Sequence, residues 1–266
     1  MHARAFDRYI AGTSPVHRLD PRVKVSLTLL IVLSNLLLPD AAWLAFALTW
    51  GLVCLGSILS DLGPAYILTR SFVALPFALA AVSAVFIVPG APVTTLAVGP
   101  WSATATDAGL ARFGSIVIRS WISVQVAILL VSTTAFPDVL YAFRHLRVPS
   151  LLIAIVSLMY RYLVVLADEA ARLLRAREAR SARLDTARRG PPIRFQARVA
   201  GNMVGQLFLR SFERSDRVYA AMLSRGYRGV PLSLRRSTFR TLDWLTLAGI
   251  GLVLVVLQVV GRVPLV

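Results

Sequence analysis

The chain has 266 residues, of which 57% are hydrophobic and only 16% are charged, yet its formal net charge is +16. Average soluble domains are about half apolar and about a quarter charged, so this composition excludes a soluble Rossmann-type enzyme, a disulfide scaffold and a disordered chain. The two properties are separated along the sequence, because 20 of the 29 Lys and Arg residues lie between Phe136 and Arg240. This distribution predicts an integral membrane protein with one large basic region outside the bilayer.

Charge-poor apolar runs locate the membrane-spanning helices, since a helix needs roughly 20 mainly apolar residues to cross a bilayer. The run 71–106 is too long for one helix and is interrupted by proline and glycine from Pro89 on, which predicts a span followed by an irregular extracytoplasmic loop. The run 148–160 is too short to cross and leads into arginines, which favours an amphipathic or interfacial helix. Five spans are therefore predicted, at about residues 24–38, 41–59, 70–88, 117–135 and 244–261.

The distribution of positive charge predicts the orientation of these spans. The N-terminal arm carries five cations, Arg4, Arg8, Arg18, Arg22 and Lys24. Five spans with a cytoplasmic N-terminus place this arm and the basic region on the inside of the cell inner (plasma) membrane, and the C-terminus outside. Three arginines count weakly against this orientation: Arg112, Arg119 and Arg262. The chain then divides into an arm with four spans (1–135), a cytoplasmic region (136–243) and a last span (244–266).

Helical spacing of apolar residues continues through the cytoplasmic region. A short helix is expected to begin at Pro137 and to end before Pro149. Two long helices follow, from about Pro149 to Arg183 and from Ile193 to Ser224, separated by a break at residues 190–192. Acidic residues four positions before arginines, Asp168–Arg172 and Glu213–Arg217, are favourable helical pairs. The predicted fold is therefore an all-α polytopic membrane protein with about five spans and three cytoplasmic helices.

Both long helices end in an arginine between small residues. The two stretches read Ala176-Arg177-Glu178-Ala179-Arg180-Ser181 and Ala221-Met222-Leu223-Ser224-Arg225-Gly226. Small neighbours would let a helix end enter a groove on another protein, where the guanidinium could form a bidentate pair with a carboxylate. The alternative is a solvated basic helix on anionic lipid headgroups, and the pattern alone slightly favours that alternative.

Three stretches resemble the transmembrane coupling (T) subunit of energy-coupling factor (ECF) transporters, a division of the ABC transporters. The first comprises Asp7-Arg8-Tyr9 and His17-Arg18-Leu19-Asp20-Pro21-Arg22-Val23-Lys24, which resemble the entry into the first span. The second is Leu158-Met159-Tyr160-Arg161-Tyr162 with Asp168-Glu169-Ala170, which is similar to the start of a long coupling helix. The third, Ala221–Gly229, is the most specific. The resemblance covers nearly the whole chain.

In that family, Ala-Arg-Gly-type motifs at the ends of two cytoplasmic coupling helices dock into grooves of two ATPase subunits. The resemblance implies that these motifs are Ala179, Arg180 and Ser181, and Ser224, Arg225 and Gly226. Serine replaces glycine in the first motif and alanine in the second, so both keep small side chains. The implied partners are two ATPase subunits, a membrane-embedded substrate-binding subunit and the lipid bilayer. The chain lacks a Walker A motif, so ATP is expected on the partner subunits, with no cofactor here.

Residues 7–9, 136–138 and 146–149 look most like the cobalt/nickel branch of the family, in which a separate membrane subunit binds the ion. The chain's own His, Cys and carboxylate residues show no metal-ligand spacing, which fits this division but also fits T subunits of vitamin transporters, such as those for biotin. Another alternative is a membrane enzyme acting on an anionic lipid, but the clustered carboxylates usual for such metal chemistry are missing. Nucleic-acid binding is disfavoured because aromatic residues are not interleaved with the arginines.

Overall fold

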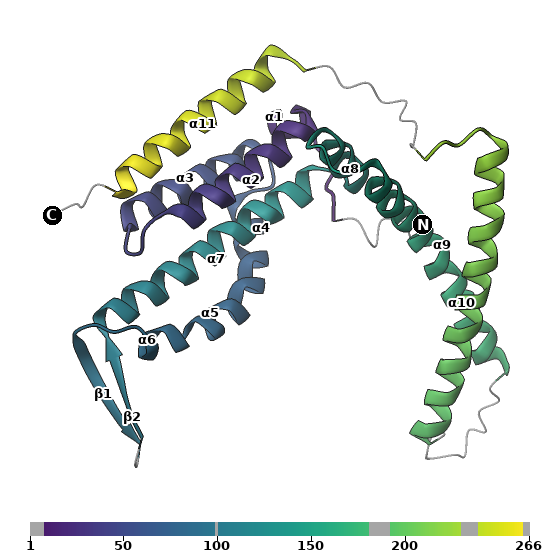
Figure 1. Ribbon diagram of the computed structural model, residues 1–266, viewed down its shortest axis with the longest axis horizontal. Helices are drawn as coiled ribbons and strands as arrows, with labels where there is room; N and C mark the ends of the chain where they lie inside the picture. Colours follow the sequence, from purple (N-terminus) through teal and green to yellow (C-terminus); the bar gives the residue numbers. More distant parts are fainter. Residues whose placement is uncertain (1–7, 99–100, 181–191, 230–238, 263–266) are drawn as a thin grey trace. The chain divides into compact units, whose positions relative to one another are not determined.

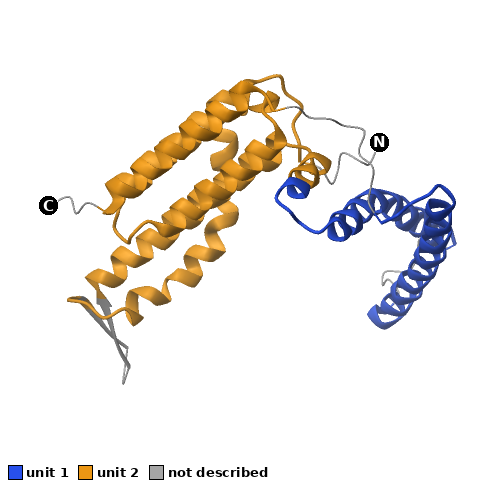
Figure 2. Cartoon of the chain, turned by 45° about the horizontal axis from the view of Figure 1, so that its top comes forward, with its two compact units in different colours: residues 1–7, 143–235 blue, residues 8–142, 236–266 orange. Residues whose placement is uncertain are grey.

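The computed structural model describes residues 8–98, 101–180, 192–229 and 239–262. The chain divides into two compact units (Figure 2). Unit 1 comprises residues 1–7 and 143–235, and unit 2 comprises residues 8–142 and 236–266. The cytoplasmic region expected from the sequence, residues 136–243, is a few residues longer at both ends than the segment 143–235 of unit 1.

Unit 2 is built on four long apolar helices (Figure 1), which are α2 (Pro21–Leu37), α3 (Trp43–Leu59), α7 (Asp107–Thr133) and α11 (Thr241–Arg262). A single helical turn, α1 (Pro15–Arg18), precedes them. The side chain of Asp20 caps α2 by accepting a hydrogen bond from the Arg22 N–H, and Pro21 occupies the first turn. Both features are favoured at a helix start. α7 and α11 each pack against both α2 and α3.

The core of unit 2 lies where the C-terminal end of α2 meets α3 and α7. It consists of Leu38, Ala45, Phe46, Val53, Ile122 and Val126. The outer faces of the same helices are also apolar, and Leu36, Ile58 and Val255 are each at least 59% exposed. Apolar surface on the outside of an apolar helix bundle is what a lipid environment requires. The chain is therefore a multi-pass membrane protein.

The third predicted span is correct in position but is not one continuous helix. It is divided into α4 (Pro64–Arg70), the 3-10 helix η2 (Ser71–Ala74), α5 (Leu75–Ala81) and α6 (Ser83–Ile87). Pro76, in the first turn of α5, has no N–H to continue the hydrogen bonds of a single helix. α7 packs along all four segments. The approach is closest at Gly109, where an added Cβ would lie 2.5 Å from the carbonyl oxygen of Val85.

The expected irregular loop after this span is instead largely a β-hairpin. β1 (Pro92–Val98) pairs antiparallel with β2 (Trp101–Thr106), with Thr94 opposite Ala105 and Val98 opposite Trp101. The stretch from Val93 to Thr95 is β-branched, and such residues favour strands. The proline and glycine residues correctly predict where the helix ends, but they do not indicate the strands that follow. Apart from this hairpin, the prediction of an all-α polytopic membrane protein is confirmed.

The fourth span begins at Asp107, ten residues before the predicted start, and therefore contains Arg112 in addition to Arg119. Both arginines are paired with Asp40. Arg119 Nη2 lies 3.0 Å from Asp40 Oδ1, and Arg112 Nε lies 4.0 Å from Asp40 Oδ2. Arg119 also donates a hydrogen bond to the carbonyl oxygen of Leu38. Two cations that counted against the predicted orientation are thus partly neutralised by a local carboxylate.

The three helices of the basic region form as predicted. They are α8 (Phe136–His145), α9 (Ser150–Arg180) and α10 (Ile193–Ser224). The predicted break falls mostly outside the described residues, although α10 does begin directly after Pro192. Within unit 1, α9 and α10 pack against each other as a crossed antiparallel pair (Figure 1).

Among the described residues, four helical stretches are long and apolar enough to cross a membrane: Pro64–Ile87, α7, α9 and α11. α3 is apolar but has only 17 residues, and α2 also has 17. By length and composition, α9 could therefore cross a membrane, whereas the sequence pattern assigns its apolar beginning to the membrane surface. The predicted spans at α2 and α3 are shorter than these four stretches.

Candidate functional site

Glu169 joins the two long helices of unit 1. Its Oε1 lies 2.6 Å from Arg210 Nη1 on α10, and its Oε2 pairs with Arg172 on α9. The Glu169 side chain is 13% exposed, whereas both arginine side chains are more than half exposed. Hydrogen bonds from Arg172 and then from Arg210 lower the pKa of Glu169, because they favour its ionised form. One carboxylate thus contacts arginines on both helices of the crossed pair.

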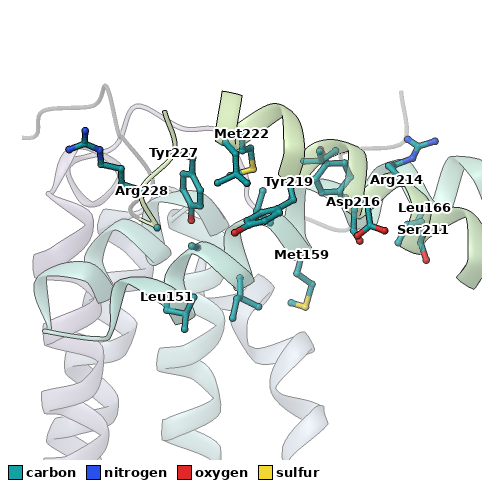
Figure 3. Close-up of a pocket in the computed structure, with 18 residues that line it drawn as sticks. Leu151, Met159, Leu166, Ser211, Arg214, Asp216, Tyr219, Met222, Tyr227 and Arg228 are labelled. Atoms are coloured by element: carbon teal, nitrogen blue, oxygen red, sulfur yellow. The ribbon is translucent and has the colours of Figure 1, made fainter. Parts of the chain in front are cut away.

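An apolar groove of about 880 Å³ follows the line between α9 and α10 (Figure 3). Leu151 and Met159 line it from α9, while Tyr219 and Met222 line it from α10. Tyr227, just beyond α10, also lines the groove. The segment that leaves α10 is therefore in the same apolar environment as the two helices.

The end of α10 has a well-defined backbone conformation. The N–H of Gly226 donates to the carbonyl oxygen of Leu223 at 2.9 Å, and the N–H of Tyr227 donates to that of Met222 at 3.0 Å. Gly226 has φ +79°, which L-residues with side chains rarely adopt. These are the features of a Schellman motif, including an apolar residue at the position of Tyr227. The turn places Arg225, which is exposed, at the tip of α10.

The end of α9 carries the other predicted residues. Ala179 and Arg180 are its last two residues, and both are exposed. Ser181, the third predicted residue of this motif, lies outside the described residues. The structure thus brings Ala179 and Arg180 together on one helical turn.

The two predicted motifs are not brought together into one site. Because α9 and α10 run antiparallel, their C-terminal ends lie at opposite ends of the crossed pair (Figure 1). In the described part of the chain, neither Arg180 nor Arg225 forms an ion pair. Each guanidinium therefore keeps its donors available for a bidentate bond to a carboxylate on another molecule.

A model of the CbiQ family, described as cobalt transport proteins, matches residues 12–236. This range covers most of the chain and both helix ends described above. The chain belongs to the CbiQ family.

Individual relatives of this CbiQ-family chain agree with the match. It is 31% identical over 144 residues to the cobalt transport protein CbiQ of Rhodobacter capsulatus, which covers 54% of this chain and 56% of that protein. It is 27% identical over 252 residues to the energy-coupling factor transporter transmembrane protein EcfT of Listeria innocua, covering 92% and 91%. With the EcfT of Exiguobacterium sibiricum it shares 34% identity over 132 residues, covering 47% and 49%. In the first and third comparisons the chain spans about half the length of the relative.

The family model and these relatives support the identification of the CbiQ-family chain as a transmembrane component of an ECF transporter. The resemblance found in the sequence is thereby confirmed. The ion pairs within the individual helices were only partly foreseen, since Arg172 pairs with Glu169 rather than with Asp168. No ion pair forms between Glu213 and Arg217 among the described residues. The contact of Glu169 with Arg210 spans 41 residues of sequence, and no helical spacing rule could have found it.

Proposed function

We propose that this CbiQ-family chain couples ATP hydrolysis by two partner ATPase subunits to movement of a separate membrane subunit that binds the transported substrate. The observation that carries the proposal is the end of α10, where a Schellman motif presents an exposed Arg225 between Ser224 and Gly226. The exposed Arg180 at the end of α9 supplies a second such end.

Each helix end is suited to enter a groove on an ATPase subunit. The small residues beside Arg180 and Arg225 leave room for close approach, and the guanidinium can pair with a carboxylate inside the groove. Losing one partner of a buried charge pair costs about 2–5 kcal/mol. Two such ends, one on each ATPase, would fix both subunits to the crossed helices.

Movement would follow from the positions of the two ends. ATP, bound by the partner subunits, brings the ATPases together, and the docked ends of α9 and α10 move with them. Because Glu169 joins the helices near the middle of α9, displacement of their ends changes how the pair crosses. That change tilts or releases the substrate-binding subunit held against the spans.

Cobalt or nickel is the proposed substrate. The family description and the name of the Rhodobacter capsulatus relative both support a cobalt transporter. Relatives named EcfT support the shared coupling role without naming a substrate, so a vitamin such as biotin remains the alternative.

The charge distribution supports a cytoplasmic position for unit 1 and a surface position for α9. If α9 crossed the membrane, α10 would lie on the extracytoplasmic side. α10 carries five arginines, Arg194, Arg198, Arg210, Arg214 and Arg217. The excess of cations on cytoplasmic segments opposes that arrangement. This charge distribution therefore supports a cytoplasmic N-terminal arm and a cytoplasmic unit 1, with α9 along the membrane surface.

Charge reversal at both ends tests the docking. The chain is co-expressed with its ATPase and substrate-binding subunits, and the ATPases that co-purify with it are quantified. Arg180→Glu with Arg225→Glu is expected to remove most of the ATPase, because each reversed charge faces the groove carboxylate of its partner. Arg175→Glu with Arg217→Glu is the matched control, since both are exposed arginines earlier on the same helices.

Equal recovery of ATPase with the two double variants would contradict the proposal. Loss of ATPase with both would show that overall basic charge, rather than the two helix ends, attracts the partner.

A further inference from the structure

The N-terminal end of α2 lies where the chain leaves unit 2 and returns to it. Unit 2 ends at Ala142 on the way to α9 and resumes at Arg236 on the way back from α10. Tyr141 comes directly before the first of these crossings, and Phe239 follows closely after the second. Both aromatic residues contact the same side chain, that of Arg22 on α2.

Arg22 contacts the two chain connections through different parts of its guanidinium. Its Nη2 donates a hydrogen bond to the Tyr141 hydroxyl. The guanidinium carbon lies 4.7 Å from the centre of the Tyr141 ring and 5.3 Å from that of the Phe239 ring. A planar guanidinium can stack on an aromatic ring while its N–H groups donate hydrogen bonds, whereas an ammonium is not planar and cannot stack.

Two buried carboxylates fix the backbone on either side of this contact. Asp20 Oδ1 accepts the backbone N–H of Arg22 at 2.9 Å. Asp243 accepts the backbone N–H of Asp20 at 3.2 Å and that of Arg240 at 2.9 Å. Asp20 and Asp243 are 5% and 4% exposed, so these bonds are shielded from water. The starts of α2 and α11 are thereby tied together.

These five residues, Asp20, Arg22, Tyr141, Phe239 and Asp243, form what we call the α2 junction. We propose that Arg22 is the positioning residue that transmits movement of α9 and α10 into the membrane helices. The inference rests on the proposed coupling function. Single-chain connections alone would absorb much of such a movement, whereas the half-buried Arg22 side chain, which contacts both connections and belongs to α2, passes it to the bundle.

The test compares transport with ATP consumption in the assembled complex reconstituted into vesicles. Radiolabelled Co²⁺ and Ni²⁺ are the uptake probes, and phosphate release measures hydrolysis. Arg22→Lys keeps the charge but loses the planar stack, and Tyr141→Phe keeps the ring but loses the hydroxyl. Both variants are expected to retain the ATPases and to lower uptake per ATP by about fivefold, the lower end of typical couplings between sites. Arg18→Lys, an exposed arginine on the same arm, is the control.

An unchanged ratio of uptake to hydrolysis would overturn the proposal, even if both activities fell, because a purely structural role lowers them together. If Arg22→Lys fails to fold, the ratio measured with Tyr141→Phe decides. Failure of the wild-type chain to bind ATPases would instead contradict the coupling function itself, so the two outcomes are distinguishable.

Discussion

Lys24 is the only lysine of the chain and is buried near the start of α2, where it is 7% exposed. Its Nζ donates hydrogen bonds to the carbonyl oxygens of His17, at 3.2 Å, and Thr133, at 3.0 Å. These carbonyls belong to the N-terminal arm and to the end of α7. A single ammonium therefore joins the N-terminal arm and the start of α2 to the end of α7, which lies 109 residues further along the chain.

Replacing Lys24 should destabilise unit 2. Lys24→Met keeps most of the apolar stem but removes the donor, and leaving buried carbonyls without a partner costs about 1–3 kcal/mol. Thermal unfolding of the purified chain in detergent is expected to show a lower midpoint for Lys24→Met than for Arg18→Met, which alters an exposed cation. Equal midpoints for the two variants would show that the Lys24 hydrogen bonds contribute nothing.

Individual functional residues can be predicted from the sequence where their neighbours in the chain form a recognisable pattern. Residues whose structural partners are distant in the sequence are missed. Small flanking residues distinguish Arg180 and Arg225 from most other arginines of the basic region. Asp243 looks like one of several scattered acids, yet it binds the backbone of Asp20, 223 residues away. Such a pairing depends on the packing of α11 against α2, which no local pattern encodes.

The ion pair between α9 and α10 requires the ionised form of Glu169. Because the folded-state pKa is lowered, its contribution to stability is fully present above the ordinary glutamate pKa and is lost as pH falls through the folded-state value. Glu169→Gln should therefore loosen the pair at neutral pH, as acidification should in the wild type.

Spin labels at Ala176 and Ser215, in a chain whose only cysteine, Cys54, is replaced by alanine, report this crossing. Glu169→Gln is expected to broaden the distance distribution between the labels, and Glu213→Gln, an exposed acid on α10, is expected to leave it unchanged. Identical distributions for both variants would mean that apolar packing alone sets the crossing.

Among the elements, the long helix α10 was predictable to the residue, whereas α7 begins ten residues before its predicted start. α10 begins and ends at the predicted residues, because proline precedes it and glycine follows it. The division of the span Pro64–Ile87 into four segments and the hairpin after it were not predictable from the sequence. Hydropathy detects that a stretch is apolar but does not show where its hydrogen bonding is interrupted.

At the scale of the whole molecule, the orientation can be tested with single cysteines in the Cys54→Ala chain. Thr94→Cys on β1 should react with a membrane-impermeant maleimide in intact cells. Ser215→Cys on α10 should react only after the membrane is permeabilised. Labelling of Ser215→Cys in intact cells would mean that α9 crosses the bilayer and that unit 1 lies outside.

The opposing properties of the chain, high apolar content and a charge of +16, agree with this arrangement. The apolar residues cover the membrane helices, and most of the arginines lie in and around unit 1. We propose that topology, lipid headgroups and acidic partner surfaces account for the general excess of charge. Arg180 and Arg225 are proposed to have the specific role of docking the ATPases.

The most direct test of that role is ATP-dependent accumulation of radiolabelled Co²⁺ or Ni²⁺ by vesicles containing the full complex. We expect Arg180→Glu with Arg225→Glu to abolish ATP-dependent accumulation, and Arg175→Glu with Arg217→Glu to leave it near the wild-type level. Accumulation at the wild-type level by the Arg180→Glu, Arg225→Glu chain would show that these helix ends do not dock the ATPases.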